Sequence, residues 1–167
     1  MRTLLLPLAF SLALSRAALA APVDLSGTWV LDKAASGDLD PLLQARGASW
    51  LERQAAQGLK VTQVIRQDGD TLVIDIDTNA KDSQETVKVD GVARPQPTPR
   101  GDVAQVTHRW EGDAWVNESV LVDDAGQTLR VTQTNRLSAD GATLTTRIRL
   151  VRGADAPVTL DRVYRRQ

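Results

Sequence analysis

Apolar and polar side chains alternate with a period of two along most of this chain. Residues 71–78 place Leu72, Ile74 and Ile76 on one face of an extended strand, and residues 143–150 repeat the alternation. This period predicts strands with one apolar face and one face in water. Because the apolar face has no covering helices, we expect the sheet to close on itself.

Turn signals separate these runs at short intervals. Asp68-Gly69, Asp90-Gly91 and Asp140-Gly141 are examples. Between residues 59 and 165 there is room for nine strands, at about 12 residues for each strand with its turn. That spacing is typical of an antiparallel sandwich or barrel.

Residues 40–58 break the alternation and predict two short helices. Asp40 supplies an acceptor at the start of the first, and Gly47 ends it. Ser49 and Glu52, three residues apart, form a capping box at the start of the second. Neither helix has enough apolar surface to form a core alone, so both must lie on the sheet.

The first twenty residues predict a signal peptide. Arg2 precedes an apolar stretch at residues 4–14, and Ala18-Leu19-Ala20 has the small-x-small pattern of a cleavage site. Eleven apolar residues are too few to span a bilayer, which takes about 20, so we expect no stable membrane anchor. The remaining residues, 21–167, are expected to form one domain. Abundant arginine and alanine suggest a bacterium with a GC-rich genome, so after cleavage near Ala20 the protein is expected in the periplasm, or secreted.

Composition excludes several classes of protein. The chain has 20 basic and 21 acidic residues, one histidine and no cysteine. It has no basic stripe for nucleic acid, no disulfide and no thiolate metal site. One histidine and scattered serines cannot supply a nucleophile with its base and orienting group. We therefore expect a non-enzymatic protein without metal or cofactor, and a monomer.

Three features together carry a family resemblance. The first strand contains Gly27-Thr28-Trp29, a helix pair follows it, and the last strand reads Arg162-Val163-Tyr164. In this order and spacing they resemble the intracellular fatty-acid-binding-protein branch of the calycins, from Leu25 to Arg166. The resemblance implies an all-β, ten-stranded up-and-down antiparallel barrel capped by a short helix–turn–helix. It also implies an internal cavity for a fatty acid or a similar small amphiphile.

The resemblance assigns the most specific roles to the last strand. In the family, the Arg-x-Tyr motif holds a ligand carboxylate, which makes Arg162 and Tyr164 the candidates here. Arginine matches a carboxylate with its fork of donors, and a phenol adds another donor. Arg166 resembles the calycin arginine that closes the barrel over the tryptophan of the GTW motif, here Trp29.

The expected cavity combines polar and apolar side chains, as a ligand with a polar head and an apolar body requires. Its other ligand-binding residues are expected to be Trp115, Asn117, Gln133, Ile74, Ile76 and Ile148. The helix pair is expected to provide an apolar portal of Leu42, Leu43, Trp50 and Leu51.

Alternatives remain for several of these residues. Arg162 could instead form an ion pair, with Glu118 or an aspartate, inside a filled barrel. Parity places Arg130 and Arg136 in water, so the second interior arginine common in the family is not expected. His108 shares an interior face and is expected to be a hydrogen-bonded core or rim histidine.

A different class of function is also open. Residues 91–101 (GVARPQPTPRG) contain three prolines, which make a stiff, extended segment that costs little entropy to bind. The alternative to a carrier is thus a periplasmic protein-binding module or hydrolase inhibitor that acts through this loop. In that case deletion of 94–100 would spare the fold.

Overall fold

The computed structural model describes residues 23–98 and 101–167 of the chain. The predicted signal peptide lies outside the described residues. Among them, no helix is long and apolar enough to cross a membrane. The elements in chain order are β1 (Gly27–Asp32), α1 (Asp40–Ala45), α2 (Trp50–Gly58), β2 (Val61–Asp68), β3 (Thr71–Thr78), β4 (Ser83–Lys88), β5 (Arg94–Pro97), β6 (Val103–Glu111), β7 (Ala114–Val122), β8 (Thr128–Leu137), β9 (Thr143–Arg152) and β10 (Val158–Arg166).

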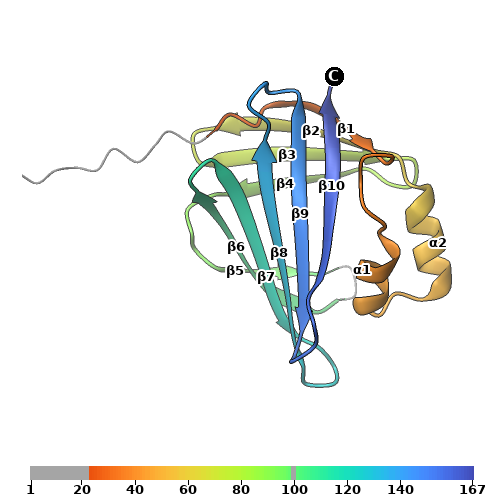
Figure 1. The fold of residues 1–167 in the computed structure, drawn as a ribbon. Coiled ribbons are helices and arrows are strands. Elements are labelled where there is room, and N and C mark those ends of the chain that lie inside the picture. The colour runs from red at the N-terminus through yellow and green to blue at the C-terminus, as the bar shows by residue number, and fades with distance from the viewer. Residues whose placement is uncertain (1–22, 99–100) are drawn as a thin grey trace, which may run out of the picture.

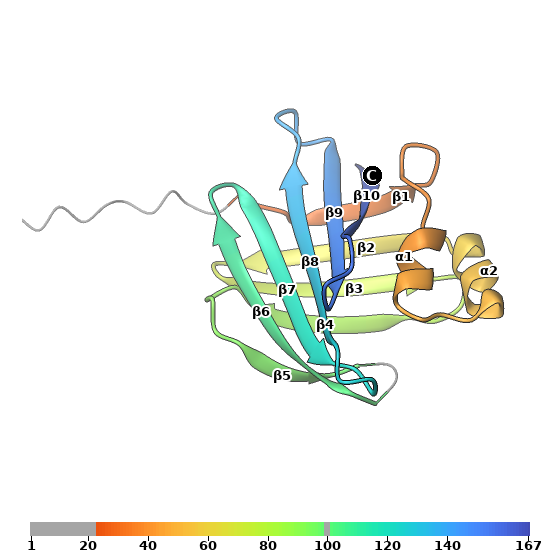
Figure 2. The same ribbon diagram turned by 60° about the horizontal axis from the view of Figure 1, so that its bottom comes forward.

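All ten of these strands form one antiparallel sheet. Its order is β4-β3-β2-β1-β10-β9-β8-β7-β6-β5, so every paired strand is next to its partner in sequence except at the pairing of β1 with β10. The layer of β1–β4 crosses the layer of β6–β10, and both helices lie at one end (Figures 1 and 2). β4 and β5 are the two edges of the sheet and are not paired with each other. The predicted all-β barrel with a helical cap is confirmed.

Arg166 covers Trp29 where β10 pairs with β1. The two residues are opposite each other in the register, and the guanidinium carbon lies 4.3 Å from the centroid of the indole ring. Arg166 also donates to the carbonyl oxygens of Gly141 and Ser26, each at 2.8 Å. Gly27 has a φ of +145°, and a Cβ there would lie 2.6 Å from Arg166 Nη1. This close approach therefore requires glycine.

The buried apolar side chains form two clusters. The larger contains Trp29, Ile65, Ile74, Trp115 and Tyr164 among its ten residues. The smaller joins Leu42 of α1 to Leu129, Leu150 and Leu160 of the sheet. α2 contributes no buried residue to either cluster.

The helix caps differ in one respect from the prediction. Leu39, not Asp40, is the N-cap of α1, and the side chain of Asp38 accepts from the amide of Asp40 at 2.9 Å. Asp40 lies inside the helix and forms an ion pair with Arg53 of α2 at 2.9 Å. Proline can occupy the second helical position as well as the first, so the pattern did not distinguish the two alignments. The predicted capping box of α2 is present.

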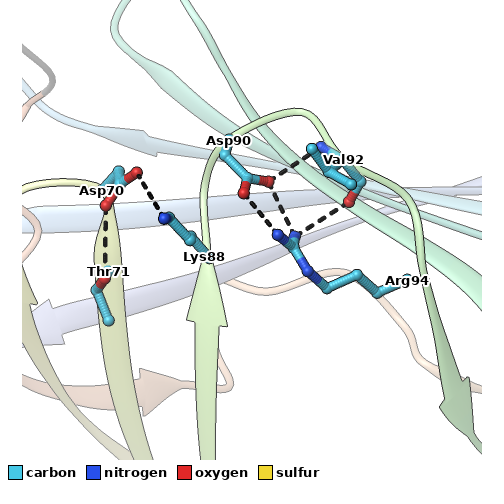
Figure 3. Close-up of polar contacts among 6 residues, drawn as sticks. All are labelled: Asp70, Thr71, Lys88, Asp90, Val92 and Arg94. Atoms are coloured by element: carbon cyan, nitrogen blue, oxygen red, sulfur yellow. Dashed lines mark hydrogen bonds and ion pairs between the residues drawn. The ribbon is translucent and has the colours of Figure 1, made fainter.

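The segment 91–101, predicted to be an extended loop, is not a loop throughout its described residues. Arg94–Pro97 form strand β5, which pairs with β6. Arg94, the first residue of β5, donates two hydrogen bonds of 2.9 and 2.6 Å to the carboxylate of Asp90 (Figure 3). The side chain of Asp90 also accepts from the amide of Val92. Removal of 94–100 would therefore delete an edge strand, and it would not spare the fold.

We predict that Arg166→Ala lowers the free energy of unfolding by about 1–3 kcal/mol, since it removes a cation–π contact and two hydrogen bonds. Urea denaturation followed by circular dichroism measures the change. Arg165→Ala is the matched control, because this exposed neighbour points to the other face and pairs with Asp32. Arg165→Ala should lower the free energy of unfolding by less than about 1 kcal/mol. Equal losses in the two variants would contradict the closure role.

A second prediction concerns Asp90. Its hydrogen bonds to Arg94 hold its pKa far below the ordinary value. A carboxyl with a lowered pKa stabilises the fold above its unfolded-state pKa, near 3.9, and loses this effect as pH falls through the folded-state pKa. Asp90→Asn should therefore reduce stability at pH 7, and the difference from the unsubstituted protein should shrink at pH 2. Denaturation at both pH values tests this, with the exposed Asp124→Asn as the control. A deficit of the same size at pH 2 would contradict the assignment.

Candidate functional site

The last strand presents Arg162 and Tyr164 to the interior of the barrel. Tyr164 is buried, at 6% exposure, opposite Leu31 of β1 and Leu144 of β9. Arg162 lies opposite Thr146 of β9 and is half-buried. Their positions two residues apart follow from the strand period, as the sequence predicted.

Arg162 opens on a cavity of about 370 Å³ beneath the helices. The cavity lies between the linker that follows β1 and the C-terminal part of α2. Leu31, Leu39 and Leu59 form its apolar walls, and Lys33 and Asp38 supply its other charged side chains. The ammonium of Lys33 donates to the carbonyl oxygen of Gln57 at 2.9 Å, which links β1 to α2. We call this space the arginine cavity.

Within the described part of the chain, no acidic side chain forms an ion pair with Arg162, and its Nε is buried without a hydrogen-bond partner. The expected alternative with Glu118 is wrong: that carboxylate binds Arg130 at 2.7 Å, on the outer face. Arg136 is likewise outside, paired with Asp113. The interior arginine is therefore available to an anion from outside the chain.

Tyr164 is electrostatically coupled to Arg162. Burial raises the pKa of the phenol, while the charge of Arg162 and hydrogen bonds from Arg162 and Gln63 lower it in part. Burial has the larger effect, so the phenol stays protonated and can act as a donor. Together, Arg162 and Tyr164 provide a charged and a neutral donor side by side.

Asn117 and Gln133 open on a different cavity, of about 210 Å³. Arg46 and Thr98 line it from outside the strands, and β4, β5, β7 and β8 supply its other polar residues. We call it the polar chamber and describe it by those strand residues: Glu85, Gln96, Asn117, Ser119 and Gln133. Glu85 hydrogen-bonds to Gln96, and loss of water raises its pKa. It still has an exposed surface, because the edges of β4 and β5 are unpaired.

The remaining predicted lining residues lie in the packed interior. Ile74 and Trp115 belong to the larger core cluster, and Ile76 packs against it. Ile148 packs against the smaller cluster that contains Leu42. The structure thus does not bring all predicted ligand residues into one open space. The arginine cavity and the polar chamber have different lining residues.

Only some of the four residues predicted to form the apolar portal lie exposed at its entrance. Leu42 is buried, at 4% exposure, and packs beneath α1. Its predicted position at the entrance of the portal is therefore wrong. The helix period puts it on the inner face of α1, whereas Trp50 and Leu51 of α2 are 66% and 70% exposed. Leu43 lines a further cavity, of about 310 Å³, together with Leu121 and Leu129.

Two residues near the cavities, one exposed and one buried, were not assigned to the site by the sequence. Glu85 lies opposite Ile74 in the register of β3 and β4, and so it belongs to the same face of the sheet as Ile74. The sequence of β4 is mostly polar and shows no alternation that would have indicated this face. His108 is 4% exposed and stacks on Trp115 with 5.8 Å between ring centroids. Neither of its ring nitrogens has a hydrogen-bond partner among the described residues, so the hydrogen bond expected for this histidine is not made within that part of the chain. Burial lowers its pKa, which keeps the ring neutral.

The described residues contain no group of three or more His, Cys, Asp or Glu side chains that could hold a metal ion.

No protein-family model and no curated protein matches the sequence. Solved structures do match it. The structure of the REP1-NXSQ fatty acid transporter aligns with a TM-score of 0.65 at 21% identity, over 86% of this chain and 96% of that one. Echinococcus granulosus fatty-acid-binding protein 1 aligns at 0.67 and 17% identity, over 85% and 96%. Human cRBP IV aligns at 0.66 and 20% identity, over 87% and 100%. The chain therefore has the calycin fold of the fatty-acid-binding proteins.

The chain has one tyrosine, so the ionisation of Tyr164 can be observed directly. We predict that its tyrosinate absorbance appears with a midpoint above the ordinary pKa of about 10. Arg162→Gln should move the midpoint higher, because it removes a charge and a donor that favour the phenolate. Arg130→Gln, on the outer face, should leave it unchanged. Circular dichroism at each pH excludes unfolding, and an unshifted midpoint in Arg162→Gln would contradict the coupling.

Proposed function

We propose that this protein is a non-enzymatic carrier or scavenger that binds a small amphiphile, such as a fatty acid or a related acyl compound, within its barrel. One observation carries the proposal: Arg162 faces a cavity with leucine walls and has no acidic partner in the described chain. A partly desolvated guanidinium without a counter-ion is costly, so a ligand anion in this place would be strongly favoured.

The charges of the arginine cavity agree with an anionic head group. Lys33 and Arg162 contribute two positive charges against the single negative charge of Asp38. Arg162 and Tyr164 would hold the head, as the Arg-x-Tyr resemblance implies. Two of the similar structures are named as a fatty acid transporter and a fatty-acid-binding protein, and these names support the same class of ligand.

An apolar tail would need space that side chains now occupy. Leu42 packs in the cluster over Ile148, so ligand entry would displace α1. α2 buries no side chain against the sheet, which makes the helix pair the part of the barrel that costs least to move. In the loaded state, the tail would lie against Ile148, Ile74, Ile76 and Trp115, and it would enter past Leu43, Trp50 and Leu51.

We also propose that residues 1–20 are removed on export and that the mature protein, 21–167, acts as a monomer in the periplasm. The support is the charged start, the apolar stretch and the small-x-small site in the sequence. The alternative of a protein-binding loop at 91–101 has no comparable support, because part of that segment serves as a strand of the sheet.

We predict that Arg162→Gln weakens binding of a long-chain carboxylate by about 10- to 100-fold, since hydrogen bonds to charged groups contribute about 1.5–3 kcal/mol. Binding of the alcohol of equal chain length should change by less than about threefold. Calorimetric titration of both ligands measures the difference, with Arg130→Gln as the control. Equal losses for acid and alcohol would contradict the assignment of the head group.

Native mass spectrometry tests the carrier function itself. The protein is purified after expression with its own first twenty residues, and its bound material is extracted with solvent. A discrete mass that is lost on denaturation, and an acyl compound in the extract, are expected. A ligand-free protein that stays free after incubation with fatty acids and lysolipids would overturn the proposal.

A further inference from the structure

The polar chamber is not needed to bind a simple fatty acid. Its lining includes residues of β4 to β8 but none of β10, the strand that carries Arg162; Figure 2 shows how these strands are arranged. A plain hydrocarbon tail that reached it would cover amides and a carboxylate without replacing their hydrogen bonds, which is unfavourable. We propose that the polar chamber binds an uncharged oxygen on the body of the ligand, so that the preferred cargo is a hydroxylated or oxo fatty acid. This inference rests on the proposed carrier function.

The chamber contains unused hydrogen-bonding groups. Asn117 and Gln133 lie opposite each other on β7 and β8, and Ser119 is two residues further along β7. Side chains of these three residues form no hydrogen bond with other described residues and face the cavity. Each amide offers two donors and one acceptor, and the hydroxyl offers both functions. A ligand hydroxyl or ketone can be matched by such a set in either direction.

The charge of the chamber differs from that of the arginine cavity. Glu85 is its one acidic residue, and Arg46 lies at its edge at the end of α1. The formal charge of the lining is therefore zero, whereas the lining of the arginine cavity is positive. A carboxylate is favoured beside Arg162, and a neutral polar group is favoured beside Glu85.

The strand register sets the separation of the two sites. Gln133 pairs with Ile148, which pairs with Leu160, two residues before Arg162. Two strand spacings and one two-residue step place the Cα atoms of Arg162 and Gln133 about 12 Å apart. Ile148 and Leu160 lie on one side of the path between them, and Thr146 and Asn135, which are hydrogen-bonded to each other, lie on the other side. A ligand that fits both sites has a carboxylate, an apolar spacer and an oxygen near the middle of its chain.

His108 supports the same inference. It pairs with Asn117 in the register and is almost completely buried, and neither ring nitrogen has a partner in the part of the chain that the structure describes. Buried polar atoms without partners are rare in folded proteins because they are expensive. His108 does not line the chamber itself, so it would gain a partner only if a polar ligand group or its accompanying water entered beside Asn117.

The test compares stearic acid with a mid-chain hydroxystearic acid by calorimetric titration of the purified protein. We expect the hydroxylated acid to bind about 3- to 10-fold more tightly. The double variant Asn117→Leu, Gln133→Leu should lose this preference. Gln105→Leu is the matched control, because Gln105 is exposed on the outer face of β6, and it should keep the preference. Arg162→Gln should weaken both acids by the same factor.

The outcomes separate the two proposals. Binding of both acids with equal affinity by the unsubstituted protein would overturn the second polar site and leave the carrier function standing. Absence of binding of either acid would overturn both. The comparison on the unsubstituted protein needs no variant, and Ser119→Ala, a smaller change, replaces the double variant if that variant fails to fold.

Discussion

The pairing of β1 with β10 is the contact on which the rest of this structure depends. It joins the two ends of the domain and closes the apolar face of the sheet upon itself, with Trp29 under Arg166. The same pairing continues into the linker, where the amide of Gly37 donates to the carbonyl oxygen of Asp161 and Val163 donates to Ser36. A Cβ at Gly37 would lie 2.6 Å from Leu160. The arginine cavity exists because this linker is held against β10.

The opposite edge of the sheet shows how the barrel can stay open at one side. β4 and β5 are both edge strands, and exposed edges tend to pair with other chains. Pro95 and Pro97 remove two amide donors from β5, a position where proline is tolerated only at an edge. The ion pair of Arg94 with Asp90 fixes the start of that strand. Nearby, the ammonium nitrogen of Lys88 lies 3.9 Å from a carboxylate oxygen of Asp70 (Figure 3). Glu85 obtains its contact with water from this opening.

The interior polar groups explain why recognition is the function that the site supports best. A barrel needs only apolar side chains for stability, and each buried polar group without a partner reduces that stability. This chain nevertheless places an arginine and a phenol in one region and two amides in another. In the proposed carrier, these groups would discriminate between ligands by charge at one site and by hydrogen bonding at the other.

The sequence by itself determined the elements and their faces. The period of two assigned Ile74 and Arg162 to the interior and Arg130 to water, because side-chain direction in a strand depends only on parity. Only the tertiary structure decided which inward residues share a space. Parity carries no information on volume, so it could not show that Leu42 fills the space over Ile148, or that Asn117 and Gln133 face a different cavity from Arg162. It also could not show that His108 has no partner, since that depends on side chains from several strands. The pairing of Arg94–Pro97 with β6 was equally hidden, because local proline content indicates an extended backbone but not its neighbour.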